Sequence, residues 1–320
     1  MANCTCTSGM GNTGTVNCLT ELKDMVKMFV VPTFKSNGTK NKVLISTTLN
    51  QAWLDALINH ADASQRWLPL GEFENVTNTR TENTFETAAS NRKSFLAEGI
   101  RSFSLEFWGN AESSPQFLGQ LKGMKCTDMS IYILDRDFNL VGVVPATEDG
   151  YFYPIRLDKN SWAANAVDAV VNASRKKNVL TFDVHPTERD EQIRWIVPSE
   201  YTADLIGATG LLDIFSEFVS ATTTTLVVDL FNRFGTAKTK QPMVGLVAAD
   251  FKDDVGGTAS RLYNLTDSLA VTIVSVTESP DGRYTFTFAA QTVADVIRVT
   301  PEKNGYDFTE VREAVDNIIA

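Results

Sequence analysis

The sequence predicts a mainly β protein (α+β), with short helices and at least two hydrophobic cores. Its 320 residues exceed what one average domain needs. Apolar and polar residues alternate in many short runs. In the run 102–108, for example, Phe103, Leu105 and Phe107 would share the buried face of a strand. We therefore expect three parts: an extended arm over 1–24, a β domain with helices over 25–220, and a β-sandwich over 221–320.

The first part is rich in Gly, Thr, Asn, Ser and Cys and has almost no apolar periodicity. An arm of this kind is expected to become ordered on a neighbouring molecule. It carries Cys4, Cys6 and Cys18, which are either reduced thiols or parts of a small metal or disulfide clip. The chain has only two histidines, and the cysteine spacing lacks a paired Cys-x2-Cys, so a zinc site is weakly supported.

In the β domain over 25–220, most strands are predicted from the alternation of apolar and polar residues, and the helices from apolar residues at helical spacing and from N-cap residues. Strands are predicted at 25–34, 42–46, 102–108, 128–134, 140–144 and 179–184, the first two joined by the turn Ser36–Thr39. Helices are predicted from an N-cap at Thr48 to about His60, at Pro115–Lys122, and at Ala163–Ser174.

The segment from Trp67 to Ile100 is polar and rich in Thr and Asn, so it suits either exposed strands or a long loop. Loops longer than about 12–15 residues in a compact domain are usually functional or ordered by a partner. If this segment is a long loop, we therefore expect it to be functional or to be ordered by a partner.

The third part is predicted to be almost purely β. Its strands are expected at 225–231, 243–248, 270–276, 283–288 and 296–300, with a hairpin turn at Ser279–Gly282. The change in composition at 221–225, Ala followed by four Thr, places the boundary near residue 221.

Charge and hydropathy exclude several classes of function. The chain has 29 basic and 39 acidic side chains, a net charge of −10, and a sequence pI near 4.8. Because affinity for a phosphate backbone comes from clustered cations, sequence-reading nucleic-acid proteins are disfavoured. No secretory signal and no apolar run of about 18–20 residues is found, which favours a soluble protein made in the cytosol.

Short motifs that suggest chemistry are incomplete. Residues 9–14 match a dinucleotide fingerprint but lack the strand and helix that it needs. Asp135, Asp137 and Asn139 begin like a calcium loop, yet Leu140 replaces its Gly, so a hairpin turn is favoured. His60 and His185 are predicted to be structural. We expect no enzyme activity and no catalytic, cofactor or metal site.

The arm and the polar segment from Trp67 to Ile100 are the remaining informative features of the sequence. Segments that cannot bury their own backbone are stabilised when identical copies pair with them. The composition therefore favours a homo-oligomeric structural protein.

The sequence resembles major tail (tail-tube) proteins of tailed bacteriophages that carry a C-terminal immunoglobulin-like domain. The resemblance lies in residues 82–87, 99–108, 116–118, 126, 131–135 and 275–290. It implies a tube-like β-barrel or sandwich flanked by a helix, stacking through residues 72–100, and an immunoglobulin-like sandwich over 221–320. It further implies stacked, six-fold rings in the virion, assembled in the host cytoplasm with other tail or head proteins. Acidity suits a lumen along which DNA slides without specific contact.

Two alternatives stay open. One is a capsid, head–tail connector or decoration protein. The other is a carbohydrate-binding adhesin that uses the immunoglobulin-like unit and exposed aromatic residues such as Trp162 or Tyr263.

Overall fold

The computed structural model describes residues 24–71, 73–108, 114–148, 150–167, 176–236, 238–253, 256–314 and 317–320. It is mainly β, with 46% strand and 12% helix, and this confirms the predicted fold class. The predicted arm lies outside the described residues up to position 23, as do Cys4, Cys6, Cys18 and the glycine motif at 9–14.

The N-terminal unit is built on a six-stranded antiparallel sheet. Its strands run in the order β14-β9-β8-β1-β3, and a sixth strand, β11, also pairs with β8. Their bounds are β1 Met25–Pro32, β3 Leu68–Gly71, β8 Met129–Asp135, β9 Leu140–Val143, β11 Ile155–Arg156 and β14 Ile193–Ile196. β8 is buried along its whole length, which places it at the centre of the unit.

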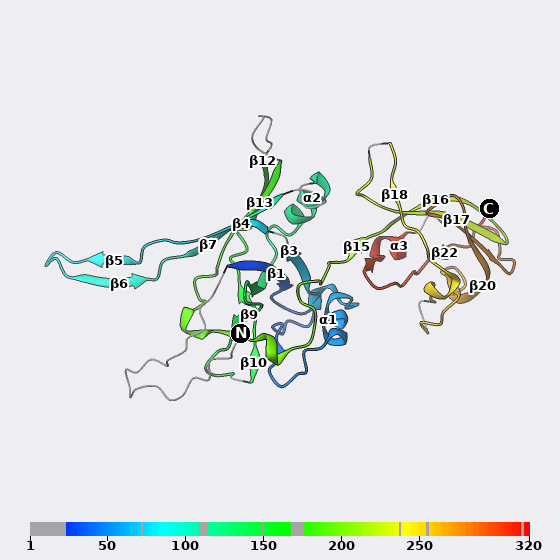
Figure 1. Ribbon diagram of the computed structural model, residues 1–320. Coiled ribbons are helices and arrows are strands. Elements are labelled where there is room, and N and C mark those ends of the chain that lie inside the picture. The colour runs from blue at the N-terminus through cyan, green and yellow to red at the C-terminus, as the bar shows by residue number, and fades with distance from the viewer. Residues whose placement is uncertain are drawn as a thin grey trace.

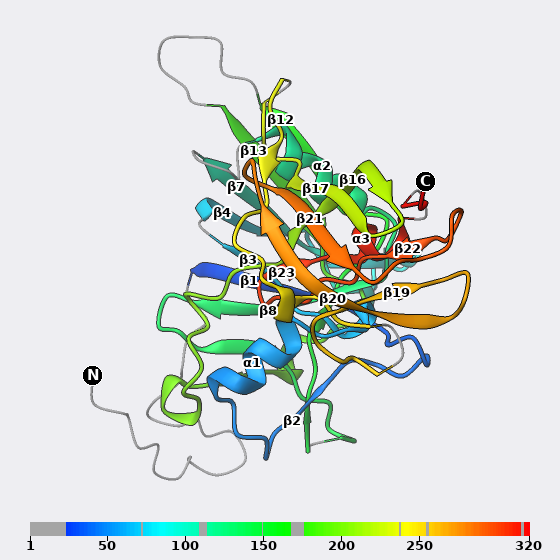
Figure 2. The ribbon, with the colours of Figure 1, turned by 90° about the vertical axis from the view of Figure 1, so that its right-hand side faces the viewer.

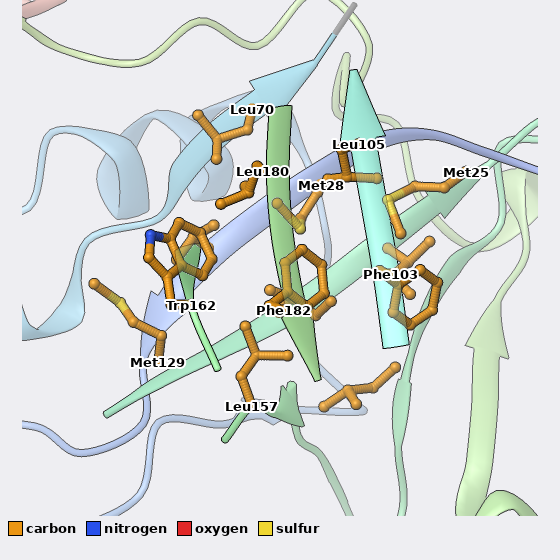
Figure 3. Close-up of a cluster of buried hydrophobic side chains, with 14 of the residues drawn as sticks. Met25, Met28, Leu70, Phe103, Leu105, Met129, Leu157, Trp162, Leu180 and Phe182 are labelled. Atoms are coloured by element: carbon orange, nitrogen blue, oxygen red, sulfur yellow. The ribbon is translucent and has the colours of Figure 1, made fainter. Parts of the chain in front are cut away.

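A second, four-stranded antiparallel sheet covers one face of the first. Its order is β12-β13-β7-β4, with β4 Phe73–Arg80, β7 Arg101–Trp108, β12 Ala163–Val167 and β13 Lys177–Asp183. Inward residues of β7 and β13 pack on Met28 of β1, as Figure 3 shows. Phe103, Leu105 and Phe107 are all buried, so the alternation predicted for 102–108 is confirmed.

A helix covers the opposite face of the six-stranded sheet. Leu54 and Ile58 of α1 (Gln51–Ile58) pack with Phe29 and Val31 of β1 in a separate hydrophobic cluster. The predicted N-cap at Thr48 is wrong, because the side chain of Asn50 accepts the hydrogen bond from the backbone N–H of Trp53 at 2.9 Å. α2 (Pro115–Gly123) begins at the predicted residue, capped by Ser114.

Two other predictions for this unit need correction. The helix predicted at Ala163–Ser174 is wrong over its first residues, which form β12 and pair with β13; residues 168–175 lie outside the described part. The predicted strand at 42–46 is shortened to β2 (Val43–Leu44), which pairs with β10 (Tyr151–Phe152) and not with β1. The turn at 36–39 does form, with the N–H of Lys35 donating to the carbonyl of Thr39 at 2.8 Å.

The C-terminal unit is a seven-stranded sheet that curls into a half-barrel. Its order is β16-β17-β21-β20-β19-β22, and β18 also pairs with β17. The bounds are β16 Phe215–Thr222, β17 Thr225–Asn232, β18 Gln241–Pro242, β19 Arg261–Asn264, β20 Leu269–Glu278, β21 Arg283–Phe288 and β22 Ile297–Arg298. The long β20 pairs with both β19 and β21, so a single curved sheet encloses the core (Figure 2).

The predicted hairpin turn at 279–282 joins β20 to β21, as expected. The predicted boundary at residue 221 falls inside β16, because that whole strand pairs with β17. Ile214 already belongs to the C-terminal core, so the division between the hydrophobic clusters lies before that residue. The segment 243–248, predicted as a strand, is not a strand in the structure.

Short elements complete the fold and join the two units. They are β15 Leu212–Asp213, which pairs with β23 Tyr306–Asp307, α3 Thr309–Glu313, and the 3-10 turns Ala63–Gln65, Asp190–Gln192, Pro198–Glu200 and Ala248–Asp250. Two polar contacts join the units: Arg66 pairs with Asp307, and the side chain of Asn59 accepts a hydrogen bond from the N–H of Gly305 at 3.0 Å.

Candidate assembly interface

A long hairpin projects from the four-stranded sheet. β4 and β7 pair along the body of the molecule, and the chain between them continues into β5 (Thr84–Thr87) and β6 (Lys93–Ala97). Figure 1 shows this hairpin extending away from the body, on the side opposite the C-terminal unit. We call residues 80–101 the projecting hairpin and residues 84–97 its tip. The candidate segment 72–100 is thus made largely of exposed strands, with residue 72 outside the described part.

The turn at the end of the tip follows from its local sequence. The N–H of Ala88 donates to the carbonyl of Arg92 at 2.9 Å, and the N–H of Asn91 donates to that of Ala88 at 2.9 Å. Asn91 has φ 57°, a left-handed conformation that Asn tolerates better than most residues. The flanking strands include Thr84 and Thr87, which suit an exposed ladder, and every residue of β5 and β6 is exposed, so the hairpin closes without a core.

The base of the hairpin is held by close packing and by charge. A Cβ on Gly99 would lie 1.7 Å from the carbonyl oxygen of Thr81, so only Gly allows the two strands to meet there. Arg80 pairs with Glu98 at 3.2 Å and also with Asp190. Arg101 lies 3.0 Å from the same Asp190 carboxylate. The hairpin therefore leaves the body in a defined direction.

The tip is apolar as well as exposed. Phe85 and Phe95 are cross-strand neighbours with ring centroids 5.9 Å apart in an edge-to-face arrangement. Their exposed fractions are 50% and 55%, and that of the adjacent Leu96 is 58%. A two-stranded hairpin is at best marginally stable in water, and exposed aromatic groups on it indicate a contact surface.

Both sheets of the N-terminal unit also have strands that pair on one side only, among the described residues. In the four-stranded sheet these are β4 and β12, and in the six-stranded sheet β3 and β14. Unpaired backbone N–H and C=O groups on such edges are templates for pairing with another chain. The hairpin and the edges of β4 and β12 form the candidate assembly interface.

A cluster of titratable side chains, including Glu148, Tyr153 and Glu188, lines a polar cavity of about 400 Å³ beside β10. Glu148 accepts a hydrogen bond from the hydroxyl of Tyr153 and lies 3.2 Å from the Lys42 ammonium. These two contacts lower the pKa of Glu148, and burial followed by the bond to Glu148 raises the pKa of Tyr153. Burial also raises the pKa of Glu188. Lys42, Glu148 and Tyr153 thus satisfy one another, which is the arrangement of a structural network.

The residues singled out as calcium-like make a turn. Asp135 is buried, and its carboxylate accepts hydrogen bonds at 2.9 Å from the N–H groups of Asp137 and Asn139 and from the Asn139 amide. All of these are the bonds of a hairpin turn between β8 and β9, as predicted. In the described residues, no group of three or more His, Cys, Asp or Glu side chains is arranged to hold a metal ion.

The two histidines each accept a backbone hydrogen bond from two residues ahead. The N–H of Asp62 donates to Nδ1 of His60 at 3.0 Å, and that of Thr187 donates to Nδ1 of His185 at 3.3 Å. Burial, with a smaller contribution from Arg156, lowers the pKa of His185. The remaining cysteine, Cys126, is exposed and unpaired.

The aromatic residues proposed for carbohydrate binding are not both exposed. Trp162 is only 3% exposed, and its Nε1–H donates to the carbonyl of Leu121 at 2.7 Å, so the prediction that it is a surface residue is wrong. Tyr263 lies half-buried in β19. Sequence reasoning did not single out Phe85 and Phe95 as candidate contact residues, although both are aromatic residues in a largely polar stretch, which is the signal that could have identified them.

No helix in the described part of the chain has the length and apolar character needed to cross a membrane. No protein-family model matches the sequence, and no curated protein matches it either.

Proposed function

We propose that this protein is a virion structural subunit that assembles with identical copies into stacked, six-membered rings forming the tail tube of a tailed bacteriophage. The observation that carries the proposal is the projecting hairpin, whose apolar tip lies far from the core of its own unit. A second chain is the partner that gives such a tip a buried environment.

The two open edges of the four-stranded sheet support the same assembly. Each copy has β4 at one edge and β12 at the other, so neighbours can extend the sheet in a head-to-tail manner. Head-to-tail contacts close into a ring when the rotation between copies allows it. The hairpin then remains available for a contact between rings.

Charge supports the role of the tube. A net charge of −10 gives the assembled protein a surface that repels DNA, so DNA passes through the lumen without specific contacts. We place the protein in the virion, assembled in the host cytoplasm beside other tail or head proteins, and the proposal includes no catalytic role.

Electron microscopy and sedimentation of the purified protein test the proposal. We expect rings or tubes that form as the concentration rises. The double variant Phe85→Ser/Phe95→Ser should require at least tenfold more protein to assemble. Leu269→Ser/Val274→Ser is the matched control, because those side chains are 63% and 73% exposed on the C-terminal unit. A wild-type protein that stays monomeric at high concentration contradicts the proposal, and closed shells would favour a capsid protein instead.

A further inference from the structure

A large cavity with mostly apolar walls lies at the segment that joins the two units. It measures about 770 Å³ and lies between β1 and β3, α2, and the segment 206–211 that leads into the C-terminal unit. Its apolar lining includes Val26, Leu68, Leu70, Phe117, Met124 and Leu211. We call it the junction groove.

The walls of the junction groove are held in place by the fold. Lys27 of β1 is buried, and its ammonium group donates to the carbonyl oxygens of Ile206 and Ala208, which ties this segment to the six-stranded sheet. β3 pairs only with β1 among the described residues, so its other edge faces the groove. The groove is therefore formed before anything binds.

The tip of the projecting hairpin has exposed apolar side chains on both of its faces. Successive side chains of a strand point to opposite faces, so Leu96 lies on the face opposite Phe95 and its partner Phe85. Each face of the tip thus carries an exposed apolar side chain, although Glu86 and Ser94 share the face of Leu96, and such a tip can contact both walls of a slot.

Charge favours the same pairing. Residues 84–97 carry two cations, Arg92 and Lys93, and one carboxylate, Glu86, in a chain whose net charge is −10. Asp213 lines the junction groove. A neighbouring depression shares the wall 207–209 and is lined by Asp55 and Asp204. One carboxylate in the groove and two in the depression beside it are thus available to the cationic turn of the tip, and the Lys27 ammonium in the groove lining is already held by two carbonyl oxygens.

A single chain does not bring these two surfaces together. Figure 1 shows the tip on one side of the N-terminal unit and the junction, near β15, on the side of the C-terminal unit. The base of the hairpin is fixed by Gly99 and by the Arg80–Asp190 pair, so the hairpin does not fold back. A contact between the tip and the groove therefore requires two copies.

We propose that the hairpin tip of one copy inserts into the junction groove of a second copy, with Phe85, Phe95 and Leu96 between the two walls. This inference rests on the proposed assembly function and names the surface that receives the hairpin. Because tip and groove are different patches, the contact is heterologous and repeats from copy to copy.

Filling the groove tests the proposal. A Cβ added at Gly210 would lie 3.8 and 3.9 Å from two atoms of Pro69, ordinary contacts, so Gly210→Trp places a large side chain in the groove without a backbone clash. Gly150→Trp, in the turn before β10, is the matched control, because a Cβ there has no atom within 4 Å and Gly150 does not line the groove. We expect Gly210→Trp to raise the concentration needed for assembly at least tenfold, and Gly150→Trp to leave it unchanged.

A cross-linking measurement keeps the test independent of the folding of that variant. Full-length protein with p-benzoylphenylalanine at position 85 is mixed with isotopically labelled wild type and irradiated. We expect cross-links between labelled and unlabelled chains, at α2 or at residues 206–211. Cross-links elsewhere, including to residues 1–23, overturn the proposal.

The outcomes separate this inference from the proposed function. If Phe85→Ser/Phe95→Ser blocks assembly while folded Gly210→Trp assembles normally, the groove is not the receiving surface, but self-assembly stands. If the wild-type protein does not assemble at all, both proposals fail.

Discussion

The hairpin that runs from β4 to β7 has an inner half, in which β4 pairs with β7, and an outer half, in which β5 pairs with β6. The two halves have opposite environments. β7 and β6 are consecutive strands, yet Phe103, Leu105 and Phe107 of β7 are buried, whereas Phe95 of β6 is exposed. Both strands are held by antiparallel ladders, so hydrogen bonding does not distinguish them. The difference is that β7 faces the six-stranded sheet, and the tip faces no second layer of its own described chain.

This contrast shows where the stability of the fold comes from. Burying a Phe or Leu side chain contributes about 1.5–3 kcal/mol relative to leaving it exposed. The buried half of the hairpin gains this free energy within one chain. The tip gains it only when another molecule covers it, so the same feature that weakens the isolated hairpin favours association.

Hydrogen exchange should show the largest difference between the two halves. In the dissociated protein, amides of Ser102–Trp108 should exchange at rates set by unfolding of the unit, and those of β5 and β6 about 1,000-fold faster or more. In assembled protein the tip amides should become protected. Equal exchange across the hairpin in the dissociated state would show that the tip is already covered.

Phe107→Ala should be the most destabilising of the substitutions considered. Phe107 is fully buried, with ring centroids 5.2 Å from Phe73 and 5.3 Å from Phe117. Its truncation should cost about 3–5 kcal/mol, measured by denaturant unfolding of the N-terminal unit. Phe95→Ala is the comparison and should change unfolding by less than about 0.5 kcal/mol while weakening assembly. A large loss of stability in dissociated Phe95→Ala would contradict the contrast.

Gly99→Ala should disturb the point where the two halves meet. The added methyl group would overlap the carbonyl of Thr81, so the strands must separate there at a local cost of about 1–3 kcal/mol. We expect faster exchange throughout residues 80–101, weaker assembly and an unchanged core. Gly119→Ala on α2, where the new Cβ has open space, is the control. Unchanged hydrogen exchange of residues 80–101 in Gly99→Ala would contradict this role of Gly99.

Asp190→Asn should have the smallest effect. It removes the carboxylate that Arg80 and Arg101 share at the base. Partly exposed ion pairs contribute about 0–1 kcal/mol each, and salt screens them. The expected result is a slight increase in hairpin exchange that disappears at high salt. An effect as large as that of Gly99→Ala would mean that charge, and not close packing, orients the hairpin.

The prediction at Ala163–Ser174 shows where sequence reasoning failed. Alanine-rich segments favour helix by intrinsic propensity, but this preference is weak. Here Ala164 packs into the core while its strand pairs with β13, so tertiary contacts override the local preference. The prediction of the N-cap of α1 was wrong for a related reason. Thr48 and Asn50 are both good N-cap residues, and the packing of Trp53 and Leu54 against β1 selects Asn50.

The amino-acid sequence alone determined the mainly β class, the inward face of β7, the start of α2 and the turn between β20 and β21, because each depends on residues close together in the chain. The sequence also showed that the segment from Trp67 to Ile100 is polar and lacks a large apolar stripe. Only the tertiary structure decided that this segment is a projecting hairpin, that Trp162 is buried, and that a groove forms beside β3. Those features depend on which distant segments pack together, and burial is a property of the packed layers rather than of any single stretch of residues.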